Sequence, residues 1–256
     1  MSWRVQGARF VMYLVGSEQP DAQDVWDAIL QPRKAQSVQR SAEGVPPTSV
    51  ATGNLRGQQL FISVQTGRID LYVGPQVPPF GRSETVELDE ALKTTLDASV
   101  FYGRKCAVKY RPWRVAIVLD AFKDATDFRH AATLLQEALD FLPQVDSVRD
   151  ANFQVNIVKP FPGQGAREMN RVCQWATMSV QTFNIPTPTP EVRVAITGNQ
   201  LQPMVTVNHI LNFQMDLSSD QSSTSPLDVG NALSMLDALG SEARRLLAEG
   251  FRGLVS

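Results

Sequence analysis

The sequence predicts an α+β protein of two related halves, each a mostly antiparallel sheet with packed helices. A strand-like run leads into a helix-like run at residues 114–142, and the same order recurs at residues 205–249. Short β-rich segments, separated by glycine, asparagine and proline, fill much of the remaining chain. We therefore expect an N-terminal half over residues 1–146 and a C-terminal half over residues 147–256.

The composition is that of an ordinary globular protein. The chain has 256 residues, of which 43% are hydrophobic and 20% are charged, and its formal net charge is −2. A chain of this length buries enough surface to be stable without a metal ion or a disulfide. A net charge so close to zero does not by itself indicate a nucleic acid or a membrane as the partner.

The two cysteines, Cys106 and Cys173, are far apart and have no metal-ligand spacing, which predicts two reduced, buried thiols. No stretch approaches the roughly 20 apolar residues of a membrane span. The apolar run after Arg9 is short, and no small-residue cleavage site follows it. We expect a protein of the bacterial cytoplasm.

In the first half, strands and helices are expected to alternate. A strand over residues 8–15 precedes a helix that starts near Pro20 and stops at Pro32, and residues 33–47 are expected to be irregular. The later expected elements are short strands at 49–55, 59–65 and 68–73, a proline-rich loop at 74–81, a helix at 86–100, strands at 105–109 and 114–122, and a helix at 127–142 capped by Thr126.

The second half is expected to begin with a strand over residues 152–158 and a turn over residues 160–167. Residues 168–183 fit a helix by their spacing and a strand by their β-branched and aromatic content, and we favour the strand. A proline-rich connector then leads to an expected β pair at residues 191–197 and 205–217.

The best candidate for a functional surface is a basic segment, residues 104–114. As a strand it would place positive side chains and an aromatic ring on one face, which suits contact with phosphates or with single-stranded nucleic acid. The candidate residues are Arg104, Lys105, Lys109, Arg111 and Trp113. The alternative is an edge strand protected by its charges, which we favour because the rest of the chain has no matching basic excess.

A second candidate is the glycine-containing loop before residue 168. Gly163 and Gly165 could expose backbone N–H groups to an anion, with Arg167 beside them. The third glycine of a dinucleotide-binding loop is missing, because Glu168 stands in its place. We therefore favour a plain turn.

No other pattern indicates catalysis, and we predict no metal and no cofactor. His130 and His209 lie on different elements, and no carboxylate is spaced to complete a metal site with them. Asp120, Asp124 and Asp127 cluster at a strand end and a helix start, where acidic residues stabilise the helix N-terminus. The sequence has no nucleophile elbow and no Walker loop. We favour a non-enzymatic protein over an enzyme.

The last helix is expected to start after Ser225 and to end at Gly250, with an apolar stripe along its length. Its segment Leu233–Leu247 (LSMLDALGSEARRLL), together with the order of elements over most of the chain, resembles a sporadically distributed family of uncharacterised bacterial proteins of about this length. The resemblance implies no activity, and it assigns no functional residue.

Three functions are therefore carried forward in order of preference. The first is a non-enzymatic protein that binds a protein partner or self-associates as part of an assembly, because the final apolar stripe could pack within the chain or across a dimer. The second is a nucleic-acid-associated component that uses the basic segment. The third is an enzyme with an anion site at residues 163–167.

Overall fold

The computed structural model describes residues 3–15, 20–42, 48–55, 57–75, 88–142, 150–162, 167–184, 204–220 and 225–255. The chain forms two compact units. The first comprises Met1–Phe122, Phe153–Gln174 and Phe213–Ser256, and the second comprises Lys123–Asn152 and Trp175–Asn212. This division differs from the one expected at residue 146, because the C-terminal part of the chain returns to the first unit.

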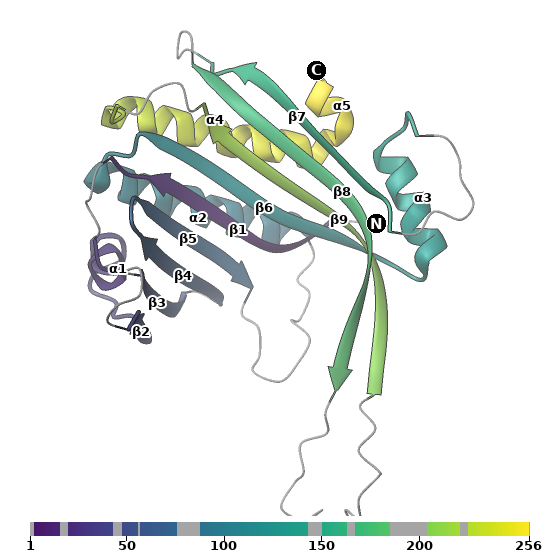
Figure 1. Ribbon diagram of the computed structural model, residues 1–256, viewed down its shortest axis with the longest axis horizontal. Coiled ribbons are helices and arrows are strands. Elements are labelled where there is room, and N and C mark those ends of the chain that lie inside the picture. Colours follow the sequence, from purple (N-terminus) through teal and green to yellow (C-terminus); the bar gives the residue numbers. More distant parts are fainter. Residues whose placement is uncertain are drawn as a thin grey trace, which may run out of the picture. The chain divides into compact units, whose positions relative to one another are not determined.

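The α+β class is confirmed by the elements in Figure 1. The strands are β1 (Arg4–Tyr13), β2 (Ser37–Arg40), β3 (Thr48–Leu55), β4 (Gln58–Gln65), β5 (Arg68–Pro75), β6 (Arg114–Ala125), β7 (Asn152–Pro160), β8 (Glu168–Asn184) and β9 (Met204–Ser219). The helices are α1 (Ala22–Leu30), α2 (Leu88–Tyr110), α3 (Phe128–Ala138), α4 (Val229–Glu249) and α5 (Phe251–Val255).

The strands form one nine-stranded sheet in the order β2-β3-β4-β5-β1-β6-β9-β8-β7. The pairs from β2 to β6 are antiparallel. β9, which is late in the sequence, lies between β6 and β8. The strands before residue 146 and those after it differ in number and connection, so the structure does not show the expected internal duplication.

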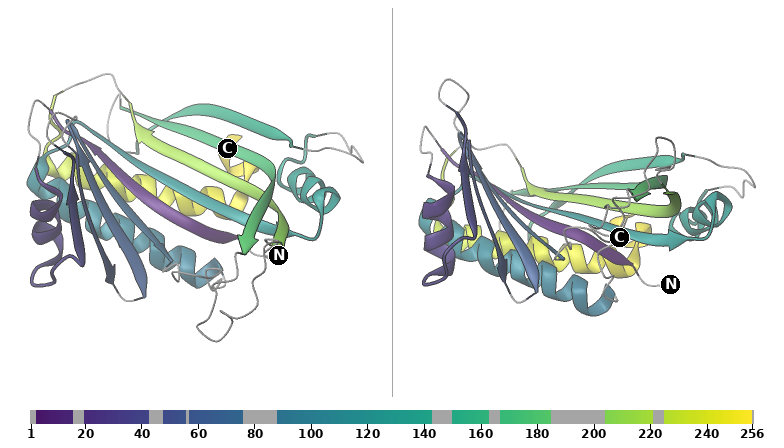
Figure 2. Two further views of the ribbon diagram at one scale, coloured as in Figure 1. Left: turned by 60° about the horizontal axis from the view of Figure 1, so that its bottom comes forward. Right: turned by 90° about the horizontal axis from the view of Figure 1, so that it is seen from below.

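Side chains along β1 show which face of the sheet meets the helices. Ala8 and Phe10 are fully buried, whereas Arg9 and Tyr13 are half-buried on the opposite face. α2 packs on β1 and β5 and against α4. A Cβ at Gly103 of α2 would lie 2.8 Å from the Phe10 ring, so glycine permits this close approach. Figure 2 shows α1, α2 and α4 on the same side of the sheet.

The predicted strand at residues 105–109 is wrong, because α2 continues through it to Tyr110. The buried positions Leu96, Ser99, Gly103 and Cys106 recur every three or four residues, which is helical spacing. Val108 is 53% exposed, so the assumed two-residue alternation is absent from this segment. The helix ends only before Pro112, where a missing N–H and a fixed φ prevent its continuation.

Most other predicted elements are confirmed. α1 is capped by Asp21, whose carboxylate accepts a 2.9 Å hydrogen bond from the Gln23 N–H. β3, β4 and β5 form the expected meander, and residues 168–183 are strand β8. α4 ends at Gly250, which has a φ of 60°. Its apolar stripe is buried within the chain, with Leu236, Leu239 and Leu246 each 0% exposed.

Three details differ from the sequence prediction or fall outside the description. The segment expected to be irregular contains β2, which pairs with β3. α3 is capped by Asp127 instead of Thr126 and ends at Ala138. The expected strand at 191–197 and most of the loop at 74–81 lie outside the described residues. Among the described helices, none has the length and apolar composition needed to cross a bilayer.

Candidate functional site on the open face of the sheet

Strand register brings arginine and tyrosine side chains together on the face of the sheet that lies opposite the helices of the first unit, here called the open face. Where β1 pairs with β5, Arg9 lies opposite Tyr72 and Tyr13 lies opposite Arg68. Where β1 pairs with β6, Tyr13 lies opposite Arg114. These positions share a face because side chains alternate with a period of two along a strand.

We call this set the open-face cluster. It consists of Arg9 and Tyr13 on β1, Arg68, Asp70 and Tyr72 on β5, Arg114 and Asp120 on β6, Asp216 on β9, and Trp113 just before β6. Within the described residues of the first unit, the helices lie on the other side of the sheet (Figure 2). Asp70 is buried, and the other members of the cluster are half-buried. The three arginines balance the three aspartates, so the cluster has no formal net charge.

Tyr13 forms the aromatic centre of the cluster. The guanidinium carbons of Arg68 and Arg114 lie 5.6 and 4.8 Å from the centroid of its ring. The centroids of the Trp113 and Tyr13 rings are 5.8 Å apart, and the backbone N–H of Trp113 donates to the Tyr13 carbonyl at 2.9 Å. A cation–π contact at an exposed site contributes about 0.5–1 kcal/mol, so these contacts restrict both guanidinium groups.

Hydrogen bonds fix the same two arginines further. Arg68 donates to both carboxylate oxygens of Asp70, at 2.7 and 2.7 Å. Arg114 donates from Nε to the Ser219 carbonyl at 3.2 Å and from its terminal nitrogen to the Ser218 hydroxyl at 3.0 Å. A bidentate arginine–carboxylate pair is geometrically specific. Both guanidinium groups therefore hold defined positions on the open face.

Arg9 is held less firmly. Among the described residues, no hydrogen bond or ion pair joins its guanidinium to another side chain, although its charge acts on nearby acids. Burial raises the pKa of Asp216, and the positive charges of Arg114 and Arg9 offset this only in part. Burial likewise raises the pKa of Asp120, against the opposing charge of Arg9. In the described part of the chain, Oδ1 of Asp216 is buried without a hydrogen-bond partner.

Tyr72 lies flat on the sheet because two of its neighbours are glycine. A Cβ at Gly7 would lie 2.3 Å from the Tyr72 hydroxyl oxygen, and one at Gly74 would lie 2.7 Å from it. No other residue fits either position without moving the ring. Burial raises the pKa of the Tyr72 phenol, and the negative charge of Asp120 adds to the effect.

The chemistry of the cluster favours binding. Arginine, tyrosine and tryptophan are the residue types most enriched at protein interfaces and at their energetic centres. Arg9 offers a positive group that has no direct hydrogen-bond partner in the described structure. The described residues contain no group of three or more His, Cys, Asp or Glu side chains that could hold a metal ion.

The structure does not bring the predicted basic residues together on one face. Arg104 forms an ion pair with Asp237 of α4. The ammonium group of Lys105 donates to the Ile29 carbonyl at 2.9 Å and so caps the C-terminal end of α1. The ammonium group of Lys109 lies 5.2 Å from the centroid of the Tyr110 ring.

The remaining two residues of that set lie beyond the helix. Arg111 is exposed, with a φ of 42°, and Trp113 belongs to the open-face cluster. Lys105 and Lys109 instead line a groove of about 670 Å³ together with Asp24 and Asp27 of α1. The two carboxylates offset the positive charge of the lysines, which weakens the attraction of this groove for phosphate.

Both cysteines are free and fully buried, as predicted. Burial raises the pKa of Cys173 to about 12 and raises that of Cys106 as well. Since the thiolate is the nucleophilic form, neither side chain is prepared for nucleophilic chemistry at neutral pH.

The glycine loop is only partly described. Gly163 and Gly165 lie outside the described residues. Arg167 is half-buried, and its carbonyl accepts a 2.9 Å hydrogen bond from the Phe161 N–H, which links the end of β7 to the start of β8. The anion site at this loop stays a prediction.

The two histidines make local contacts in the second unit. The His130 ring accepts a 3.2 Å hydrogen bond from the Thr126 N–H. His209 Nδ1 lies 2.9 Å from the Ser179 hydroxyl, beside a pocket of about 350 Å³ that Asp150 also lines. A serine–histidine pair needs a third group to orient the imidazole for catalysis, and no such bond to His209 occurs in the described residues.

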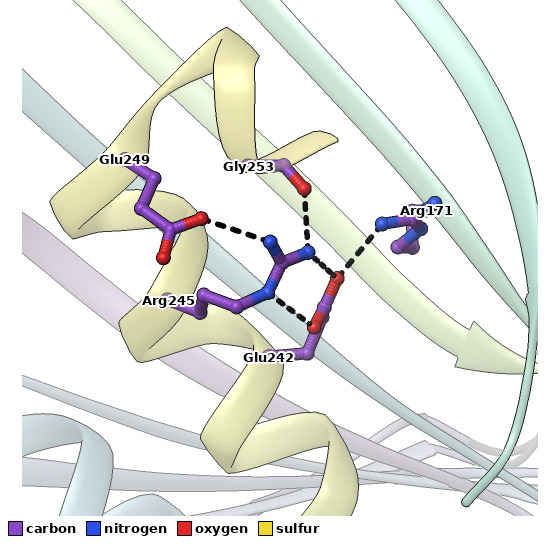
Figure 3. Close-up of polar contacts among 5 residues, drawn as sticks. All are labelled: Arg171, Glu242, Arg245, Glu249 and Gly253. Carbon is purple, nitrogen blue, oxygen red and sulfur yellow. Dashed lines mark hydrogen bonds and ion pairs between the residues drawn. The ribbon is translucent and has the colours of Figure 1, made fainter. Parts of the chain in front are cut away.

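A network of charged side chains in the first unit connects β8 with α4 and α5 (Figure 3). Arg171 is 3% exposed and donates to Glu242 at 2.9 Å. Glu242 also accepts from Arg245 at 3.0 and 2.7 Å, and Arg245 bonds to Glu249 at 2.9 Å and to the Gly253 carbonyl. Burial alone would raise the pKa of Glu242, but the hydrogen bonds from Arg245 and Arg171 lower it overall. This network ties the final helices to the sheet.

Comparisons with protein-family models, with curated proteins and with solved structures each found no match to this chain. The functional argument therefore depends on the geometry described above. Sequence reasoning missed the open-face cluster, although one signal was available: Arg68, Asp70 and Tyr72 alternate with fully buried residues on β5. The strand order places Arg68, Asp70 and Tyr72 beside Arg9 and Arg114, and no local sequence pattern specifies that order.

Proposed function

We propose that this protein is a non-enzymatic binding or assembly component and that a protein partner docks on the open-face cluster. The proposal is supported by one observation above all: arginine and aromatic side chains are concentrated on a sheet face that the helices of the first unit leave uncovered. The mixed charge of the cluster suits a protein surface that presents both signs, because electrostatic complementarity directs docking and excludes wrong partners.

The defined positions of Arg68 and Arg114 also favour binding. A long side chain loses about 0.5–1.5 kcal/mol of conformational freedom when an interface immobilises it. Here the hydrogen bonds and the contacts with Tyr13 restrict both arginines before any partner arrives. Arg9 remains the one guanidinium of the cluster without a hydrogen bond in the described structure, and it is available to a carboxylate of the partner.

The experiment is affinity purification of the tagged full-length protein from its native host. We expect a protein to co-purify with the wild type, and we expect Arg9→Ala to reduce its recovery at least tenfold, which corresponds to about 1.4 kcal/mol. Arg33→Ala, which removes an exposed arginine next to α1, is the matched control and should retain the partner. Thermal unfolding of each variant checks that its fold is intact.

Two results would contradict the proposal. One is a folded Arg9→Ala variant that recovers as much partner as the wild type does. The other is a wild-type protein that recovers no partner at all. The nucleic-acid alternative has less support, because Lys105 and Lys109 share their groove with Asp24 and Asp27.

A further inference from the structure

The two edges of the sheet are protected very differently. The edge strands are β2 and β7, and within the described residues neither has a strand on its outer side. An edge strand presents unpaired N–H and C=O groups, which natural proteins protect with short length, charges or proline. β2 is four residues long and ends in Arg40. β7 is nine residues long, and its only charge and its only proline, Lys159 and Pro160, are at its C-terminal end.

Hydrogen bonds at both ends of β7 show which backbone groups face outward. The Phe161 N–H donates to the Arg167 carbonyl, and the Ala151 carbonyl accepts from the Thr177 N–H, each at 2.9 Å. In an antiparallel strand, both backbone groups of one residue point the same way, and they alternate from residue to residue. The odd-numbered residues therefore bond toward β8, and the even-numbered residues 152–158 point their N–H and C=O groups away from it.

The side chains of β7 are also suited to the addition of another strand at this edge. The odd-numbered Phe153, Val155 and Ile157 are apolar but only half-buried, on the side of the sheet where Phe153 meets Phe251 of α5 at 6.0 Å. The even-numbered residues on the opposite side are exposed. A strand added beside β7 would therefore gain main-chain hydrogen bonds and cover a row of partly exposed apolar side chains.

We propose that a second copy of this chain occupies this edge, with β7 of each copy pairing antiparallel across a two-fold axis at Val155. In this register Phe153 lies opposite Ile157 of the second copy, and Val155 lies opposite its own counterpart. On the other side of the sheet, Gln154 lies opposite Asn156 of the second copy. The pairing places apolar side chains against apolar side chains, amides against amides, and no like charges opposite each other.

The same register joins the outward main-chain groups at the centre of the strand. Residue 154 of one copy pairs with residue 156 of the other, so the N–H group of each finds a carbonyl. Pro160, which has no N–H, falls outside the pairing. A two-fold interface is self-complementary and closes at two copies, so the assembly does not grow into a fibre. β7 is separate from the open-face cluster, and this inference does not rest on partner binding there.

A cysteine cross-link of the full-length protein tests the register. Val155 would form a non-hydrogen-bonded pair with its counterpart, with Cα atoms about 4.5 Å apart, which lies within the range for a disulfide. We expect Val155→Cys to form a disulfide-linked dimer under mild oxidation. Ile157→Cys would lie opposite Phe153 and should remain unlinked. Equal cross-linking of both variants, or none of Val155→Cys, would overturn the proposed pairing.

Light scattering after size-exclusion chromatography tests dimerisation through β7 without introducing a cysteine. The wild type and Asn156→Ala should run as dimers. Asn156→Pro removes one outward N–H that is not bonded to β8, a position where an edge strand tolerates proline, and it should run as a monomer. The unfolding midpoint of the separated monomer shows whether the fold is retained. A monomeric wild type, or a folded Asn156→Pro variant that is still dimeric, would contradict the inference.

Discussion

Asp216 shows, at the scale of single residues, how an uncovered sheet face can still bury charge. The neighbouring side chains of the open-face cluster exclude water from one of its oxygens, and in the described structure no donor replaces that water. An unsatisfied polar atom of this kind costs free energy in the isolated protein.

The raised pKa of Asp216 predicts a pH dependence of stability. A carboxyl group whose pKa is higher in the folded state binds more protons there, so the free energy of unfolding falls as pH rises through its ordinary pKa of about 3.9 and beyond. Asp216→Asn should therefore be at least as stable as the wild type at pH 7. The gain should be below the ~1.4 kcal/mol of one full pKa unit, since solvent screens the partly exposed group.

Urea denaturation at several pH values measures this difference. The two proteins should converge in stability below about pH 3, where the aspartate is protonated in both states. Asp24→Asn, which removes an exposed charge from α1, controls for the change in net charge. A variant clearly less stable than the wild type at pH 7 would show that the attraction of the arginines for Asp216 outweighs its burial.

Residue-level prediction from the sequence was strongest where one local rule applies. The buried thiols followed from position alone and are confirmed, whereas the cap of α3, expected at Thr126, is Asp127. Arg111 and Trp113 were placed on the same face as Lys105 and Lys109 only because a strand was assumed. The proximity of Arg9 to Asp216 could not be predicted from the sequence, because these residues are far apart in the chain and approach each other only through the order of β1, β6 and β9.

The ion network at β8 is a feature whose energetic effect can be tested at the scale of elements. It joins a strand to the last two helices through one glutamate that accepts from two arginines. Arg171 is the member that depends most on this arrangement, because it is almost fully buried and Glu242 is its one ion-pair partner in the described residues. Removing that carboxylate would leave a buried positive charge.

We expect Glu242→Leu to destabilise the protein by about 3–5 kcal/mol, as the loss of one partner from a buried ion pair does. The double variant Arg171→Met, Glu242→Leu should recover most of this loss, because a well-packed apolar pair often replaces a buried ion pair at little cost. Chemical denaturation of the single and double variants measures the coupling. A single variant within 1 kcal/mol of the wild type would show that water reaches Arg171.

The element scale also shows where composition and end signals identified an element correctly. Strand β8 was distinguished from a helix by its β-branched and aromatic content, and α4 by its cap and its apolar stripe. The error at residues 105–109 arose because lysines and valine occur in both kinds of element, while the helix-defining contacts of Gly103 and Cys106 are made with distant parts of the chain. β2 was missed because it is short and polar and forms only by pairing with β3.

For the molecule as a whole, the interleaved units predict how fragments behave. A fragment of residues 1–146, the expected N-terminal half, would lack β9, β8 and α4 and would expose the full length of β6 as a new edge. We expect this fragment to aggregate or to unfold without a cooperative transition, whereas the full chain unfolds cooperatively. Solubility and thermal unfolding measured by circular dichroism compare the two. A soluble, cooperatively folded fragment would instead support the division at residue 146.

The position of β9 in the sheet has a consequence for the synthesis of this protein. β6 is translated well before its neighbour β9. A nascent chain that has left the ribosome up to residue 200 therefore has one edge of β6 unpaired, and the side of α2 that packs on α4 is uncovered. Pairing between segments so distant in sequence is slow, and the waiting intermediate is prone to aggregation. Productive folding must therefore await the synthesis of β9 and α4, and we expect chaperones to engage the chain until then.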